Sequence, residues 1–525
     1  MKHELGTHSV RMRGAAAGGT GGARVGALVC AAALLISAGA EAQPAADKPA
    51  AEPAPAGEAT AREPRAAASP GGAAAEQAAG FDQALRQRIA RPGGLTAKQA
   101  SARAVASSSE LKQSAAELRS AQADDDQAAA GYLPRVALTA RYTRLSEVGS
   151  SSLGTLVATT QPGLVAPGQP LFGVDVGFPQ ILDQYLLQAN VVVPLTDYFL
   201  RTNHLNAATA HGVEAAKYRQ QVAQRSAALY AQLSYYAWAQ ARLSAVVATR
   251  TLEQAQAHYR VADVAHQAGA LTRAELLRFD AQVATAELML ERARSAEEIN
   301  EDALRSWLHD PDTKRYAIGE DLMAPLPPLK RSGARALREK AQRQRPEFLA
   351  LQQSEKALGE QRKGVKASTL PRLDAFGNAY YANPTQRQFP QKDAWTASWD
   401  AGLQLTYVIN DIPSANASAR SLEAKQSALR AQQASLRDLL RREVSQARRS
   451  ALEADVALRL AARGLEASEE AYRATLLQFR ADRIRSVELT DANTALLRAR
   501  LELVAAHINQ RVSRVRLAYA LGDPL

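Results

Sequence analysis

Two carboxylate residues near the C-terminal end of the chain, Glu488 and Asp491, stand three positions apart in a segment of helical character. That spacing puts both side chains on one face of a helix. Carboxylates gathered in a group attract cations and repel one another, which raises their proton affinity. A pair of solvated surface acids is the simpler interpretation, and the residue types alone leave both open.

The residue patterns of known catalytic sites are missing from the sequence. There is no P-loop, no dinucleotide-binding glycine motif, no G-x-S-x-G and no cysteine nucleophile. The histidines are dispersed, without an H-x-x-x-H pair or a Cys/His cluster, and the acidic run 124–126 lacks the glycine and spacing of a calcium loop. We therefore expect no enzyme activity, no cofactor and no metal site.

The N-terminal segment has the features of a secretory signal. Three arginines precede an apolar run at 25–36, and Ala38-Gly39-Ala40 follows it as a cleavage site. The run is too short for a permanent membrane helix. Cys30, the only cysteine, lies inside this segment, so the exported chain would have no thiol. The net charge of +11 is scattered along helical faces among acidic residues, so we do not expect nucleic acid as a partner.

The sequence contains two tandem copies of one pattern. Glu110 and Glu347 are 237 positions apart, as are Pro134 and Pro371, whereas three later pairs share an offset of 213: Tyr259-Arg260 with Tyr472-Arg473, Glu275-Leu276 with Glu488-Leu489, and Asp310-Pro311 with Asp523-Pro524. The difference locates an insertion of 24 residues in the first copy, between positions 142 and 193. A repeat of this length indicates a duplicated architectural unit.

Alternating apolar and polar residues predict one two-stranded hairpin in each copy. The strands are expected at about 133–143 and 186–196, and at about 371–382 and 397–408. The segments between them, roughly 144–185 and 383–396, are rich in Gly, Pro, Ser and Thr and are expected to be loops.

The remainder of each copy is helical in composition. Residues 96–130 predict a helix that begins at the N-cap Thr96, and uninterrupted runs at 203–268 and 414–480 predict coiled-coil helices of about 100 Å. The expected fold is mainly α with a small β part.

The predicted organisation has five parts. They are a signal peptide at 1–40, a disordered Ala/Pro-rich segment at 41–94, a first repeat at 95–311, a connector at 312–331 and a second repeat at 332–525.

Amphipathic hairpins on an exported chain predict strands that face lipid on one side and a polar lumen on the other. Four strands are too few to close a barrel, and an open sheet cannot lie in a bilayer because its edges leave backbone groups without hydrogen bonds. Several copies must therefore share one barrel. Two copies would give eight strands and a filled lumen, and three would give twelve and room for a pore.

The order of these motifs resembles the TolC-like outer-membrane efflux proteins over about residues 95–523. The similarity rests on the marks Leu133-Pro134-Arg135-Val136, Val193-Pro194-Leu195-Thr196-Asp197, the stretch from Ala268-Gly269 to Leu276, Arg345-Pro346-Glu347-Phe348 and Leu370-Pro371-Arg372-Leu373. The resemblance implies a homotrimer with a twelve-stranded barrel in outer-membrane lipid and a helical periplasmic tunnel. It also implies docking by a periplasmic adaptor (membrane fusion) protein and an inner-membrane RND or ABC transporter, for multidrug efflux or type I secretion.

The same resemblance assigns candidate residues at the periplasmic tips. Glu488 and Asp491 match the acidic constriction on the inner helix of the second repeat. Residues near the two tips are candidates for a latch between helices or for adaptor docking: Gly269, Arg273, Glu275, Arg480, Asp482, Arg483 and Arg485. Asp482 stands where many members of the family have Gly.

The main alternative is a periplasmic adaptor or coiled-coil scaffold protein. Adaptors normally carry one helical hairpin between short β-rich domains, whereas this sequence has two full copies of the helix and hairpin pattern. A soluble Ala-rich coiled coil with incidental hairpins is a further alternative, and matched hairpins at corresponding positions argue against it.

Overall fold

The computed structural model describes residues 87, 89–148, 152–159, 162–177, 180–329, 333–481 and 483–525. These residues belong to one compact unit, 68–525. The expected signal peptide and most of the expected disordered segment lie outside them. Within the described residues, no helix combines the length and the apolarity needed to cross a membrane.

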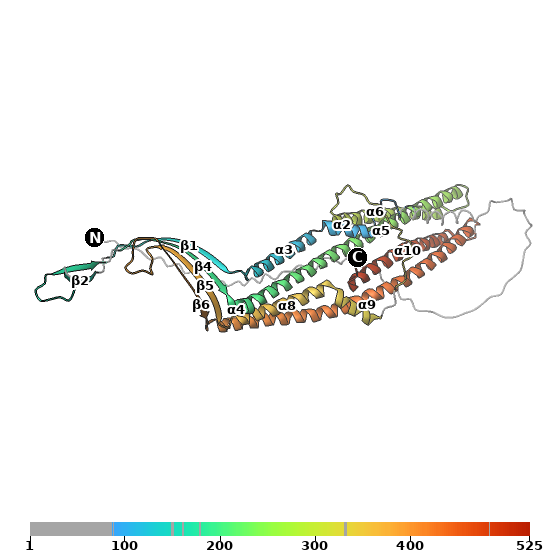
Figure 1. Cartoon of the computed structure of the whole chain (residues 1–525). Coiled ribbons are helices and arrows are strands. Elements are labelled where there is room, and N and C mark those ends of the chain that lie inside the picture. The colour runs from blue at the N-terminus through green and yellow to red at the C-terminus, as the bar shows by residue number, and fades with distance from the viewer. Residues whose placement is uncertain are drawn as a thin grey trace, which may run out of the picture. The chain divides into compact units, whose positions relative to one another are not determined.

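The described chain consists of two copies of one order of elements (Figure 1). In the first copy these are α2 (Ala97–Ser107), α3 (Ser109–Ala130), β1 (Arg135–Arg144), β4 (Asp183–Pro194), α5 (Asn203–Gln267) and α6 (Arg273–Leu308). In the second copy they are α7 (Ala334–Gln344), α8 (Pro346–Ala367), β5 (Arg372–Asn383), β6 (Thr396–Thr406), α9 (Asp411–Arg480) and α10 (Ser486–Leu521). The first and last residues of α10 lie 213 positions after those of α6, which is the offset found in the sequence. The predicted fold class is confirmed.

Residues 96–130 do not form the single helix that composition predicts. Ser108 leaves helical geometry, with φ −55° and ψ 123°, and its side chain accepts a hydrogen bond from the Leu111 amide at 3.2 Å. It therefore caps α3 and separates it from α2. The second copy breaks at the matching position, Arg345, which precedes Pro346 at the start of α8. A residue before proline is disfavoured in helical geometry, so the two copies make the same break by different means.

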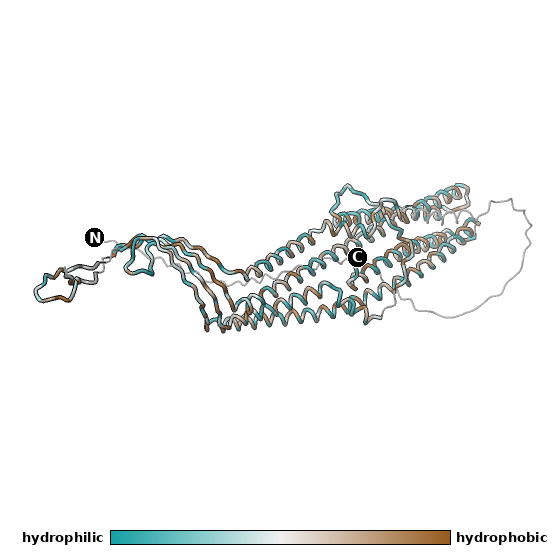
Figure 2. Tube along the Cα trace, viewed as in Figure 1, coloured by the Kyte–Doolittle hydropathy of each residue, from teal (hydrophilic) through white to brown (hydrophobic). Residues whose placement is uncertain are grey.

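The four main strands form one antiparallel sheet in the order β1-β4-β5-β6. Asn190 lies opposite both Ala137 on β1 and Asn378 on β5, and Asn378 lies opposite Asp400 on β6. Residues in register share a face, so these polar residues define a polar face and the alternate residues an apolar one. In Figure 2 apolar and polar residues are interspersed along all four strands.

The segment expected as a loop at 144–185 contains a second, two-stranded sheet. β2 (Ser152–Thr159) pairs antiparallel with β3 (Leu171–Gly177). The expectation of a loop was wrong over these residues, because backbone pairing tolerates the glycines that argued against strands in the sequence.

The long helices pack side by side. α5 contacts α3 and α6, and it also contacts α8 and α10, whereas α9 contacts α8 and α10. The C-terminal end of α10 meets the start of α8, because Gly522 lies against Gln344. α8 and α10 thus follow one another between the two long helices. This leaves α3 and α6 on one flank and α9 on the other.

The largest apolar core lies where α5, α6 and α10 meet the connector. Trp238, Tyr235 and Leu243 of α5 are fully buried with Leu304 of α6. Ile318, which belongs to the connector, is also fully buried in this cluster, so the connector is part of the core rather than a loose link.

Candidate functional site

The first helical tip, between α5 and α6, is a turn with conventional caps at both sides. Gly269 has φ +74°, a conformation that favours glycine, and the Ala270 amide donates to the Ala265 carbonyl at 2.9 Å to close the end of α5. α6 then begins with a capping box. The Glu275 amide donates to the Thr272 hydroxyl at 3.3 Å, and the Thr272 amide donates to the Glu275 carboxylate at 3.0 Å.

The capping role of Glu275 explains its electrostatics. Hydrogen bonds from the side chain and backbone of Thr272 lower the pKa of Glu275, and the nearby positive charges of Arg278 and Arg485 contribute in the same direction. The carboxylate thus serves the end of its own helix rather than an ion pair with another helix.

The second tip, between α9 and α10, repeats the turn but not the capping box. The Arg483 amide donates to the Gln478 carbonyl at 3.0 Å, which matches the bond from Ala270 to Ala265. Arg485 stands where the first repeat has Thr272, and its side chain makes no capping hydrogen bond with α10. Glu488, which corresponds to Glu275, is therefore not held by a cap. Asp482 lies outside the described residues.

The two acidic candidates lie on the exposed face of the first turns of α10. Glu488 and Asp491 are both exposed, whereas Ser486 and Leu489 beside them are buried. No hydrogen bond or ion pair from either carboxylate is found in the part of the chain that the structure describes. The structure therefore presents both charges to the surroundings on one helix face, and their role at an aperture stays a prediction.

The arginine candidates are also exposed. Arg273, Arg480, Arg483 and Arg485 have exposed side chains, and no ion pair within 4.0 Å joins any of them to an acid among the described residues of this chain. A latch made by these residues within one copy has no support in the described contacts, so their role as a latch or docking site stays a prediction.

A polar contact between the repeats near the tips was not foreseen from the sequence. The His258 ring on α5 lies 2.8 Å from the Tyr472 hydroxyl on α9. Burial, and then the positive charge of Arg480, lower the pKa of His258 to about 4. His258 is therefore neutral at pH 7 and joins the two long helices beside the apolar cluster of Phe279 and Leu476. Nothing local in the sequence indicates this contact, because the partners are 214 residues apart.

A second unforeseen site is the buried Arg345, at the junction of α7 and α8. Its guanidinium lies 2.9 Å from the Glu347 carboxylate and 3.0 Å from that of Glu443 on α9, and its centre lies 4.7 Å from the ring of Tyr519 on α10. The side chain is 6% exposed. This residue holds four helices together, which accounts physically for the mark Arg345-Pro346-Glu347 noted in the sequence.

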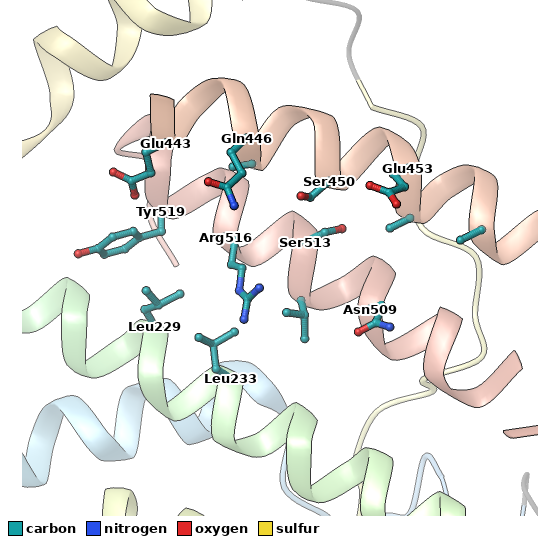
Figure 3. Close-up of a pocket in the computed structure, with 14 residues that line it drawn as sticks. Leu229, Leu233, Glu443, Gln446, Ser450, Glu453, Asn509, Ser513, Arg516 and Tyr519 are labelled. Carbon is teal, nitrogen blue, oxygen red and sulfur yellow. The ribbon is translucent and has the colours of Figure 1, made fainter. Parts of the chain in front are cut away.

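A groove of about 440 Å³ lies between α5 and the α9–α10 pair (Figure 3). Leu229 and Leu233 of α5 form its apolar side, and α9 contributes polar groups that include Glu443 and Glu453. Figure 3 shows the side chain of Arg516 on α10 pointing toward Leu233 of α5. Charged and apolar side chains thus meet in this groove, where α5, α9 and α10 come together.

The polar face of the sheet carries a connected network. Asn190 donates to Asn378 at 2.6 Å, and Asn378 donates to Asp400 at 2.7 Å. Arg387, from the turn between β5 and β6, makes an ion pair with Asp400 and lies over the ring of Tyr380. The turn is thereby fixed against the polar face.

The sequence matches the family model "outer membrane efflux protein" over residues 100–308 and 337–523. The chain belongs to the outer membrane efflux protein family. The two matched ranges correspond to the two structural copies, and the family is one of transport conduits rather than enzymes. No curated protein matches the sequence.

Solved structures of outer-membrane channels share the fold of this efflux protein. The outer-membrane channel OprN is similar with a TM-score of 0.64 at 20% identity, over 85% of this chain and 91% of that one. The open state of the Neisseria gonorrhoeae MtrE channel gives 0.65 at 16% identity, over 81% and 89%. The Campylobacter jejuni CmeC channel gives 0.62 at 15% identity, over 84% and 86%.

Proposed function

We propose that this efflux protein is a passive conduit in which three copies close a twelve-stranded barrel in the outer membrane and a helical tunnel in the periplasm. The observation that carries the proposal is the apolar face of the main sheet, whose outer strands β1 and β6 each have one partner strand among the described residues. Leu138, Trp399, Leu403 and Leu405 on that face are each between 69% and 81% exposed. An exposed apolar face of this kind fits contact with lipid, and lipid requires that every backbone group be paired within the barrel.

The flanks of the helical part support closure by further copies. α9 carries exposed apolar residues, Leu439 and Leu460 among them, and α6 on the opposite flank carries Leu288 and Ile299, also exposed. Apolar residues on both flanks fit side-by-side packing of one copy's α9 against the next copy's α6. Because α3 leads into β1 and β6 leads into α9, the same two flanks would close both the tunnel and the barrel.

In this proposal the inner-membrane pump, of the RND or ABC type, supplies the energy and selects the cargo, and a periplasmic adaptor joins pump and channel. The proposed conduit requires no cofactor. The exposed candidates at the tips, Gly269, Arg273 and Arg483, are then accessible to an adaptor. The competing function is that of the adaptor or scaffold itself.

Channel activity separates the two functions. The purified protein, added in detergent to a planar lipid bilayer, should give discrete conductance steps. An adaptor or a scaffold would leave the bilayer current unchanged, and that result would refute the proposed conduit.

The acidic face of α10 is proposed as the aperture of this conduit. Three copies would bring six carboxylates together, which favours cations and binds divalent ions. Glu488→Gln combined with Asp491→Asn should lower cation selectivity and divalent block in the bilayer assay, whereas Glu339→Gln on α7 should change neither. Unaltered selectivity in the double variant would remove both residues from the aperture.

The exposed arginines could close the tips through pairs between copies, although each exposed pair is weak. Charge reversal at Arg483 or Arg485 to Glu should then raise the resting conductance. An unchanged conductance would argue against the latch.

A further inference from the structure

The two free edges of the main sheet have complementary residues. In the described chain β1 pairs only with β4, and β6 pairs only with β5. Arg141 on the polar face of β1 is exposed and has no ion pair among the described residues, whereas Asp400 on the polar face of β6 accepts from Asn378 and pairs with Arg387. Exposed strand edges pair readily with another chain.

The directions of the strands allow these two edges to meet. All neighbouring strands in the sheet are antiparallel, so β1 and β6 run in opposite directions. A β6 from a second copy placed against β1 therefore continues the antiparallel order without any change of direction.

Strand length and face restrict the register of such a seam. Polar-face residues must lie opposite polar-face residues, because a slip by one residue would turn the apolar side toward the lumen. Under that condition, the ten residues of β1 fit wholly within β6 in one register, which places Arg135 opposite Thr406 and Arg144 opposite Ala397. Arg141 then lies directly opposite Asp400.

The apolar face matches in the same register. Leu138 lies opposite Leu403, and Tyr142 lies opposite Trp399. All four side chains are exposed in the single copy. Aromatic and aliphatic pairs across neighbouring strands stabilise a sheet.

Barrel geometry gives an independent check of the register. Within one copy, Arg135 is level with Val192, Phe376 and Gly402. A seam that places Arg135 opposite Thr406 advances by four residues per copy. Over three copies the advance along the strands is about 40 Å, and the twelve strand spacings, measured at right angles to the strands, sum to about 58 Å. The ratio of these two lengths gives a strand tilt of about 35°.

The relation between the advance per copy and the strand tilt also limits the other registers of the seam. The usual tilt of outer-membrane barrels is about 35–45°. An advance of two residues per copy gives about 19°, which is too flat. An advance of six gives about 46° and places Thr143 opposite Asp400, with Arg141 on the diagonal and within reach of a long side chain.

Closure of the proposed trimeric barrel pairs β1 of one copy with β6 of the next. We propose that Arg141 of β1 then joins Asp400 of the neighbouring β6 in an ion pair on the lumen side of each seam. This inference rests on the proposed trimeric conduit and adds the residues and the register of its closure. Because Asp400 already holds Arg387, each seam would link the barrel wall to the turn between β5 and β6 of the neighbouring copy.

Paired cysteines test the seam directly. Cys30 is the only natural cysteine, so a Cys30→Ala background carries only the introduced thiols. Within one chain, positions 141 and 400 lie on the two edge strands and are offset by four residues along the strand direction. They are therefore about 19 Å apart, which is too far for a disulfide. Oxidised Arg141→Cys/Asp400→Cys, or Thr143→Cys/Asp400→Cys for the steeper tilt, should therefore give covalent dimers and trimers.

The matched control is Ala140→Cys/Asp400→Cys, in which the two thiols belong to opposite faces and should stay unlinked. If the untreated protein has the mass of a trimer and neither test pair crosslinks, the seam is refuted and the conduit survives. A monomeric mass would refute the conduit as well.

A charge variant tests the ion pair without any disulfide. Arg141→Glu places a carboxylate beside Asp400 and should lower the temperature at which the trimer dissociates in mild detergent. Arg135→Glu, on the same strand and face but opposite the uncharged Thr406, should lower it much less. Equal effects from the two variants would contradict the ion pair.

Discussion

A fall in pH should destabilise the packing of α5 against α9 at the helical tips through protonation of His258. The pKa of His258 is about 4 in the folded chain because the ring is buried and near Arg480, against an ordinary value of about 6.5. Above pH 6.5 the ring is neutral in both the packed and the opened tip, so it carries no penalty. As the pH falls from 6.5 towards 4, the opened tip binds a proton that the packed tip refuses, and the packed state loses stability.

The size of the effect follows from these two pKa values. Between pH 7 and pH 5 the packed tip loses about 2 kcal/mol in each copy, which corresponds to about a 20-fold increase in the population of the opened tip. Protonation makes both ring nitrogens donors, so the charged ring could only donate to the Tyr472 hydroxyl, which lies 2.8 Å away.

Hydrogen exchange of peptides that cover the end of α5 and the end of α9 measures this opening, after correction for the intrinsic effect of pH on exchange. His258→Gln keeps a polar partner for Tyr472 but does not titrate, so it should remove the 20-fold change. His266→Gln, at the same tip, should leave it in place. If His258→Gln shows the full pH dependence of the native chain, the explanation is wrong.

Two further predictions follow from the tips and the buried junction. Arg485→Thr should restore a capping box in the second repeat and stabilise the start of α10 by about 1 kcal/mol, as measured by hydrogen exchange. Unchanged exchange would contradict this. Arg345→Ala should destabilise the fold by about 3–5 kcal/mol because two partly buried carboxylates lose their partner. Arg335→Ala, whose side chain is 93% exposed, should have almost no effect in the same thermal unfolding measurement, and similar losses would refute the role of the junction.

Local sequence patterns predicted the elements that repeat. Alternation located the four main strands, and the two offsets located the copies, because both signals depend on neighbouring residues and on duplication. The small hairpin of β2 and β3 escaped prediction because its glycines and serines resemble those of a loop. The cap at Ser108 escaped because helical composition continues on both sides of it.

The role of the candidate site stays a prediction, and the structure describes only where its residues lie. Spacing placed Glu488 and Asp491 on one helix face, and the structure leaves that face exposed. The two copies differ in how the equivalent residues Glu275 and Glu488 are held. Glu275 forms a capping box with Thr272, whereas Arg485, at the position equivalent to Thr272, makes no capping bond with α10. Contacts between distant segments, such as that of His258, depend on how helices pack and leave no periodic signal.

In the proposed conduit, one chain supplies only a third of a closed wall. Native mass spectrometry of the purified protein in detergent tests it most directly. The proposed trimer requires one dominant species with the mass of three chains, and a monomer that persists across detergents and protein concentrations would refute it.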